Sequence, residues 1–254
     1  MTLQDLLDEL AQNILRDRST IVSGPEDYLW SDATLIRYID EAQNILARKG
    51  LVLRDATTPD VTEVALSDGE SQYTLHPSII AVISAKIAGD KGDLARTGHS
   101  ALSLVQRPDP HFFDPEYIST LPPGKPLAFA TDEQIDSASG KSGIVSLRTY
   151  PEPNADYDNV VLQLRVVRKP LRRLSEDDLS AEPEVPEDYH LALLDWAAYR
   201  ALRNIDTDVG AIDKANTFKN EFEAMVAQAR TDAMRKLFAP MHWGFGRNGF
   251  AWEN

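Results

Sequence analysis

Residues 190–229, HLALLDWAAYRALRNI-DTDVG-AIDKANTFKNEFEAMVAQA, decide the fold of this 254-residue chain. Apolar residues recur at helical spacing in two runs, from Leu191 to Ile205 and from Ala211 to Ala229. Each run would place its apolar side chains on one face of a helix. The segment 206–210 between them contains Asp and Gly and interrupts the pattern. The two runs therefore predict an antiparallel helical hairpin, whose seam consists of Leu191, Leu194, Ala198, Ala201 and Ile205 on one helix and Ala211, Ala215, Phe218, Phe222, Met225 and Ala229 on the other.

Two more amphipathic helices are predicted near the amino terminus. The first has Thr2 as its N-cap and an apolar stripe formed by Leu3, Leu7, Leu10 and Ile14. The second begins after Ser31, ends at Gly50 and has a stripe formed by Leu35, Ile39, Ala42 and Leu46. A loop at 19–29 separates them. We expect both helices to pack on the carboxy-terminal hairpin.

Between these helical parts the pattern is that of β-structure. Predicted strands are Val61–Leu66, Gln72–Leu75, Ile79–Ile87, Ala101–Val105, Leu127–Ala130, Ile144–Thr149 and Val160–Val167. The turn 67–71 joins the first two. Short strands without long helices between them favour a small β-sandwich or barrel.

The predicted fold class is therefore α+β, with a helical bundle interrupted by a β-rich insertion. Residues 1–55 and 175–238 would form the helical domain, and residues 56–174 the β-rich insertion. Residues 239–254 would form an extended tail. Composition supports a folded chain, because 43% of the residues are hydrophobic and 26% are charged.

The net charge of −14 argues against tight binding to nucleic acid, which depends on Lys and Arg at the phosphates. The basic cluster Arg168–Arg173 is followed by Glu176, Asp177 and Asp178, and we interpret it as a locally neutralised linker. No apolar run reaches the roughly 18 residues of a membrane span. The first residues do not resemble a secretory signal, and the absence of cysteine suits a protein made in the cytoplasm.

The sequence contains partial matches to cofactor and metal motifs, but the residues around each match lack what the motif requires. The glycines of 244–249 follow the spacing of a dinucleotide loop, but no strand–helix unit surrounds them. Gly140-Lys141-Ser142 lacks the leading glycine of a P-loop, and Asn154, Asp156 and Asp158 lack the glycine and glutamate of a calcium loop. The histidines show no zinc spacing. We predict no catalytic residue, cofactor or metal, although a triad of residues distant in sequence stays open.

The tail is unusual because it alternates aromatic residues with glycines. Aromatic side chains bury large areas and often anchor interfaces. We predict that the tail docks on a partner protein through Met241, His242, Trp243, Phe245, Arg247, Phe250 and Trp252. The alternative is that the tail folds back onto its own domain.

Two segments resemble the head-to-tail adaptor proteins of tailed bacteriophages, particularly short-tailed ones. They are residues 30–43, WSDATLIRYIDEAQ, and residues 185–202, VPEDYHLALLDWAAYRAL. The helix KANTFKNEF at 214–222 follows the second segment as it does in those proteins. The intervening region resembles those proteins only in being rich in β-structure, without matching sequence motifs.

The resemblance implies a structural virion protein at the head–tail interface that is made in the host cytoplasm. Such adaptors form a ring, usually of twelve copies, beneath the portal protein of the capsid. The helical parts make the body of the ring, the β parts face neighbouring copies and a tail or nozzle protein, and the carboxy-terminal segment reaches into the portal. DNA would pass through the ring on ejection without specific binding, and no membrane is involved.

Three other interpretations stay open at this point. The first is another neck or tail-tube component of a phage. The second, of a different class, is a hydrolytic or metal-dependent enzyme with an unrecognised site. The third is a binding module that acts on the host side.

Overall fold

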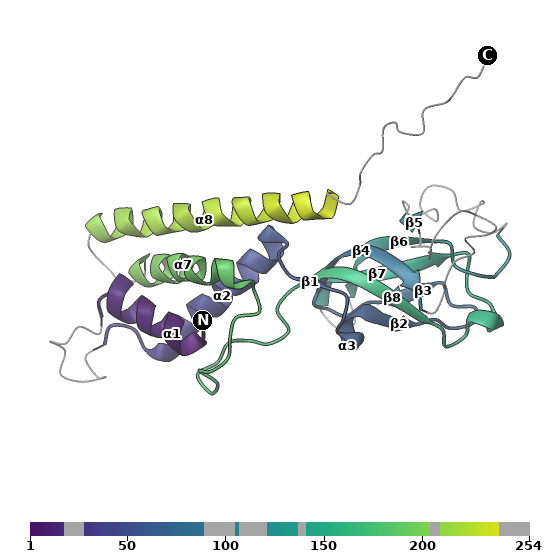
Figure 1. The fold of residues 1–254 in the computed structure, drawn as a ribbon, viewed down its shortest axis with the longest axis horizontal. Coiled ribbons are helices and arrows are strands. Elements are labelled where there is room, and N and C mark those ends of the chain that lie inside the picture. Colours follow the sequence, from purple (N-terminus) through teal and green to yellow (C-terminus); the bar gives the residue numbers. More distant parts are fainter. Residues whose placement is uncertain (18–27, 89–104, 107–120, 137–140, 204–208, 239–254) are drawn as a thin grey trace, which may run out of the picture.

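The computed structural model describes residues 1–17, 28–88, 105–106, 121–136, 141–203 and 209–238. The fold class is α+β, as predicted, with a group of helices and two β-sheets. Figure 1 shows an elongated arrangement, in which the long helices lie at one end and the strands at the other. The chain crosses from helices to strands after α2 and returns after β8.

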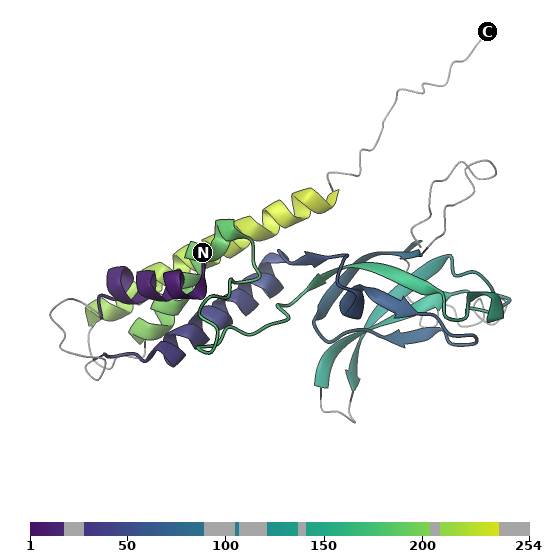
Figure 2. The same cartoon turned by 60° about the horizontal axis from the view of Figure 1, so that its bottom comes forward.

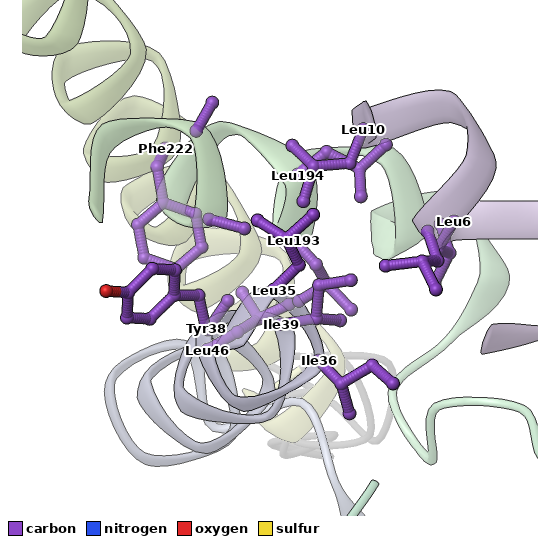
Figure 3. Close-up of a cluster of buried hydrophobic side chains, with 14 of the residues drawn as sticks. Leu6, Leu10, Leu35, Ile36, Tyr38, Ile39, Leu46, Leu193, Leu194 and Phe222 are labelled. Atoms are coloured by element: carbon purple, nitrogen blue, oxygen red, sulfur yellow. The ribbon is translucent and has the colours of Figure 1, made fainter. Parts of the chain in front are cut away.

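The helical part consists of α1 (Leu3–Asp8), the π-helix η1 (Glu9–Ile14), α2 (Asp32–Gly50), α7 (His190–Arg203) and α8 (Val209–Phe238). Side chains of all five elements meet in one apolar core. Figure 3 shows this core, where Leu10 comes from η1, Ile39 from α2 and Leu194 from α7, and Phe222 closes the cluster from α8. Phe222 is 1% exposed. The predicted packing of the amino-terminal helices on the hairpin is therefore present.

Both predicted N-caps are formed. Thr2 accepts a hydrogen bond from the Asp5 amide at 3.2 Å, and the Asp5 carboxylate accepts one from the Thr2 amide at 2.9 Å. The Ser31 hydroxyl accepts from the Thr34 amide at 3.3 Å. These bonds satisfy amide groups that have no partner within the first turn of a helix.

The end of α2 differs from the prediction in its physical cause. Gly50 is the last helical residue, but the left-handed conformation belongs to Leu51, whose φ is 55°. A Cβ atom on Gly50 would lie 3.3 Å from the Cβ of Ala229 on α8. The close passage of α8, and not a turn of the backbone at this residue, therefore favours glycine at position 50.

The hairpin helices α7 and α8 are present, but one predicted seam residue is wrong. Leu191 is 59% exposed, whereas Leu193 is fully buried. The buried face of α7 is centred on Leu193, Leu194 and Ala197, about 100° round the helix from Leu191. Residues 204–208, which include Ile205, lie outside the described residues, as does most of the predicted loop at 19–29.

The strands form two sheets. One contains β1 (Arg54–Asp55), β2 (Glu63–Ala65), β4 (Ile79–Ile87) and β8 (Val161–Arg168). β8 is its central strand, with β4 on one side and β1 and β2 on the other. The second sheet has the order β3 (Gln72–Thr74), β7 (Lys141–Tyr150), β6 (Ala128–Asp136) and β5 (Val105–Gln106).

The two sheets enclose a second apolar core. Leu162, Leu164 and Val166 point into it from the first sheet, and Phe129 and Leu147 from the second. Of the two predicted architectures, this corresponds to the sandwich and not to a closed barrel, because the two sheets share no strand. Figure 2 shows the two sheets from a second direction. Three short helices complete the description: α3 (Pro59–Thr62), η3 (Ala155–Tyr157) and η4 (Glu187–Tyr189).

Two strand predictions need correction. The segment 61–66 begins as the end of helix α3, and only Glu63–Ala65 is a strand. The turn at 67–71 does not make a hairpin, because β2 and β3 belong to different sheets. The Tyr73 hydroxyl donates to the Glu70 carbonyl at 2.6 Å and so stabilises the turn that connects the two sheets. Of the predicted strand 101–105, only Val105 lies in the described part, within β5.

Candidate functional site

The predicted docking residues of the tail, Met241 to Trp252, lie outside the described residues, so their role stays a prediction. The structure does describe the helix that precedes them. α8 runs for 30 residues to Phe238, and Ala233 is the last buried apolar residue among those whose burial the structure describes. At that point the Arg54 guanidinium of β1 donates to the Ala233 carbonyl oxygen. The tail therefore follows a long helix that contacts both the helical core and the first sheet.

An ion-pair cluster joins the helical part to the β part. Arg168, the last residue of β8, donates from Nε to Asp55 at 2.7 Å and from Nη1 to Glu184 at 2.6 Å. Asp55 lies on β1, immediately after the chain leaves the bundle, and Glu184 lies just before it re-enters. The side chains are 5 to 16% exposed. One arginine therefore ties together both connections between the two parts of the molecule.

Hydrogen bonds set the charges of this cluster. Burial alone would raise the pKa of the Asp55 carboxyl, but amide donors from Thr57 and Thr58, the Thr58 hydroxyl and Arg168 bring that pKa well below its usual range. The pKa of the Glu184 carboxyl is also lowered. Burial would raise it, but Arg168 and the amides of residues 171 and 172 outweigh that effect. Both carboxylates raise the pKa of Arg168 against the opposing effect of burial. All three groups are charged near neutral pH.

The same carboxylates hold the connecting segment 169–186 in place. Glu184 Oε1 accepts from the amides of Leu171 and Arg172, each at 2.8 Å. The Leu174 amide donates to Asp40 of α2 at 3.1 Å, and the Glu184 amide donates to Gln43 of α2 at 2.7 Å. The sequence interpretation assigned the neutralisation of Arg168–Arg173 to residues 176–178. For Arg168 the structure shows that the carboxylates come from residues 55 and 184.

The large residues of the two resembling segments have structural roles. The Trp30 amide donates to Asp17 at 3.2 Å and its side chain is 6% exposed. Tyr38 is buried, with the guanidinium groups of Arg37 and Arg200 at 5.5 Å and 5.3 Å from its ring centre. Such contacts add a cation–π attraction to apolar burial. Trp196 packs on Phe222, with ring centres 5.3 Å apart.

The two described histidines are also explained by their surroundings. His190 is 2% exposed and its Nε2 lies 2.9 Å from the Val185 carbonyl oxygen, which holds the start of α7. His76 Nδ1 lies 2.7 Å from the Ser78 hydroxyl in the turn before β4. The second contact brings a base and a hydroxyl within hydrogen-bond distance, but Ser78 is buried and its amide also donates to His76 Nδ1 at 3.2 Å, so we interpret the contact as part of the turn. His99, His111 and His242 lie outside the described residues.

Asp195 on α7 has the most altered acid strength of the described carboxyls whose pKa is raised. Burial raises the pKa of this carboxyl to about 6, and the negative charge of Glu221 on α8 adds to the effect. Such a group can act as a general acid or base when a substrate site adjoins it. Here the group lies at a helix–helix contact, so we interpret it as a consequence of packing.

The structure shows ordinary local roles for the described residues of the motifs that were rejected in the β region. Asn154 accepts from the Asp156 amide at 3.3 Å and starts the short helix η3, as a polar turn does. Lys141 and Ser142 lie on strand β7. In the described ranges, no three His, Asp or Glu side chains lie close enough together to hold a metal ion. None of the helices in those ranges is both long and apolar enough to cross a membrane.

Comparison with known proteins gives one family. The model of the SU10 adaptor protein family matches residues 1–244, which include the helical part, the β part and the start of the tail. No individually curated protein matches the sequence. The match extends across the β region, where the sequence resemblance alone was weak.

Proposed function

Because the chain belongs to the SU10 adaptor protein family, a family of structural bacteriophage proteins and not of enzymes, we propose that it forms the ring that joins the capsid portal to the tail. The family membership itself means that the protein is a component of the phage virion. The finer proposal is that several copies surround the channel through which the DNA leaves the capsid. The resemblance to adaptors of short-tailed phages suggests twelve copies.

The path of α8 is the observation that carries this proposal. The helix is about 45 Å long at 1.5 Å per residue, and its buried stripe from Ala215 to Ala233 fixes it to the bundle. It leads directly into the aromatic tail, which starts at residue 239. A rigid helix that ends in a segment with four large aromatic residues is suited to place that segment in a groove of another protein. We propose that this groove belongs to the portal.

The ion-pair cluster of Arg168 suits a protein that transmits position between two partners. Breaking a pair of this kind leaves a poorly hydrated charge without a partner, which is costly. The cluster therefore resists bending between the bundle and the sandwich. We propose that the bundle forms the body of the ring and that the sandwich faces a neighbouring copy and a tail or nozzle protein.

The acidic character of the chain suits a passage for DNA. At a net charge of −14 the surface as a whole repels phosphates, so DNA would slide past without being held. We propose that the inner wall of the ring is acidic for this reason.

The mass of the complex tests the proposal. The protein would be measured alone and after mixing with the portal protein of the same phage, by native mass spectrometry and by electron microscopy of the product. We expect a monomer or loose oligomer alone and a closed ring of defined copy number on the portal. A mixture in which the two proteins remain separate at micromolar concentration would contradict the assignment to the portal side.

A further inference from the structure

Five cationic residues lie on the elements that meet where the end of α8 passes the end of α2 and the first sheet. We call them the basic patch: Arg48, Lys49, Arg54, Arg165 and Arg230. Gly50 approaches Ala229 closely, so the backbone at Arg48 and Lys49 of α2 lies beside the backbone at Arg230 of α8. The Arg54 guanidinium contacts the next turn of α8 at Ala233. Burial lowers the pKa of Arg54, and the charge of nearby Arg165 lowers it further.

The patch is not neutralised within the described part of the chain. Arg48, Lys49, Arg165 and Arg230 are all exposed. Each ion pair found among the described residues involves other cations: the amino terminus, Arg168, Arg200, Lys219 and Arg235. In a chain with a net charge of −14, a group of exposed and unpaired cations is a local positive surface that can attract a negative partner.

The same chain carries a matching acidic loop in its connecting segment. The exposed carboxylates of this loop are Glu176, Asp177, Asp178 and Glu182. Asp177 and Asp178 accept hydrogen bonds from the Ser175 and Ser180 hydroxyls and form none of the ion pairs found among the described residues, so the four carboxylates of the loop outnumber the neighbouring cations Arg172 and Arg173. The loop is fixed to the bundle, because the amides of Leu3 and Gln4 donate to the Ala181 and Leu179 carbonyl oxygens at 2.8 Å and 3.0 Å.

The end of α8, which carries Arg230, and the connecting segment, which carries the acidic loop, lie on different sides of the bundle. In Figure 1 the carboxy-terminal end of α8 runs along the upper edge, and the connecting segment hangs below the helices near the amino terminus. The two charged surfaces of one molecule are therefore placed to contact two different neighbours.

We propose that the basic patch of one copy binds the acidic loop of the next copy in a head-to-tail contact. A contact between two different surfaces of identical molecules repeats from copy to copy and closes into a ring when the rotation between copies allows it. Opposite charges also favour the correct pairing over symmetric contacts, where like charges would meet. The inference rests on the proposed function, because it names the contact that builds the proposed ring.

Charge exchange between the two surfaces tests the contact. One full-length variant carries Arg48→Glu, Lys49→Glu and Arg230→Glu, so both of its surfaces are negative. The second carries Glu176→Lys, Asp177→Lys and Asp178→Lys, so both are positive. We expect each variant alone to self-associate at least about tenfold more weakly than the unchanged protein at low salt. An equal mixture should regain association, because each reversed surface then meets a complementary one.

Sedimentation velocity at graded salt concentration gives the association, and circular dichroism verifies that each variant is folded. A matched control keeps the charges of the basic patch, through Arg48→Lys, Lys49→Arg and Arg230→Lys, and should associate as the unchanged protein does. Zero-length carbodiimide cross-linking should join Lys49 of one copy to the carboxylates 176–178 of another.

Three outcomes would overturn the proposed contact. They are a mixture that associates no better than its components, an unchanged protein that stays monomeric and uncross-linked at low salt and high concentration, or a first variant that loses only duplex DNA binding. The last result would make the patch a nucleic-acid site. Binding to the portal is measured separately on the same variants, which retain the tail. A failed charge exchange with intact portal binding would therefore contradict the contact and leave the proposed function standing.

Discussion

Arg168 donates to Asp55 at 2.7 Å and so joins the first strand after the bundle to the last strand before the chain returns to it. The same guanidinium reaches Glu184 at 2.6 Å. This side chain, whose partners are largely shielded from water, thus contributes to the relative position of the two parts of the molecule. The first prediction follows from this dependence.

Replacing Arg168 by Ala should destabilise the protein by about 3 kcal/mol, because two poorly solvated carboxylates lose their cation. The replacement should also speed protease cleavage in the segment 169–186, whose amides are held by Glu184. Urea unfolding and limited proteolysis measure the two effects. Arg165→Ala is the matched control, since Arg165 is exposed on the same strand and should change stability by less than about 0.5 kcal/mol. Equal behaviour of the two variants would contradict the bracing role of the cluster.

Gly50→Ala should lower the stability of the protein, although alanine favours a helix over glycine by about 1 kcal/mol. The added Cβ would lie 3.3 Å from three atoms, on Ala229, Leu46 and Val52, and the Ala229 atom cannot rotate away. Thermal unfolding gives the sign. The companion variant Leu51→Gly should not lower stability, because glycine relieves the positive φ of 55° at that position. If Gly50→Ala were the more stable of the two variants, contact with α8 would not be the reason for glycine at position 50.

These two sites also show where prediction from sequence succeeds and where it stops. The caps at Thr2 and Ser31 and the strand at 79–87 were predictable, because a local pattern determines them. The role of Gly50 was missed because it depends on a helix about 180 residues further along the chain. The partner of Arg168 lies 113 positions away, and no local signal marks Asp55 as that partner.

Sheet pairing shows the same limit. The strand predictions located β4, β7 and β8 well, but the turn at 67–71 was interpreted as a hairpin when it crosses between sheets. Turn residues indicate that the chain changes direction and do not indicate which strand it pairs with next. The exposure of Leu191 was missed because two neighbouring faces of α7 are apolar and only the packing partner chooses between them. The docking residues of the tail stay a prediction.

Asp195 predicts a pH dependence of stability. Its pKa is raised to about 6 in the folded protein, and in the unfolded chain it returns to about 3.9. Between these values the folded state binds more protons, so this carboxyl lowers stability as the pH rises from about 4 to about 6. Asp195→Asn should remove that loss and raise the melting temperature at pH 7, with little effect at pH 4. Asp213→Asn, exposed on α8, is the control. If Asp195→Asn left the pH dependence of the melting temperature unchanged, the Asp195 carboxyl would be exposed to water in the folded protein.

The core predicts a large effect at Phe222. Phe222→Ala should cost about 3–5 kcal/mol, since the ring is 1% exposed and packs against Trp196. Leu191→Ala removes a large side chain from the neighbouring helix at a site that is 59% exposed, and should cost far less. Chemical denaturation measures both. Similar losses from the two changes would mean that α7 is rotated relative to the described packing.

Deleting residues 241–254 should leave a folded protein that no longer binds the portal. The last buried apolar residue described on α8 is Ala233, and Pro240 discourages continuation of the helix, so the domain's own packing would end before the deletion. Ordering an extended segment costs conformational entropy, which its aromatic side chains would offset only when they are buried in a partner. Trp243→Ala together with Trp252→Ala should therefore reproduce the loss of binding.

The matched control for the tryptophans is Asn248→Ala together with Glu253→Ala, which changes two polar residues of the same tail. Circular dichroism reports the fold, and co-sedimentation with the portal protein reports binding. If the truncated protein binds the portal at full strength, the tail does not dock. If it unfolds, the tail belongs to the core of its own domain. If the polar control loses as much binding as the tryptophan variant, aromatic burial is not the driving interaction.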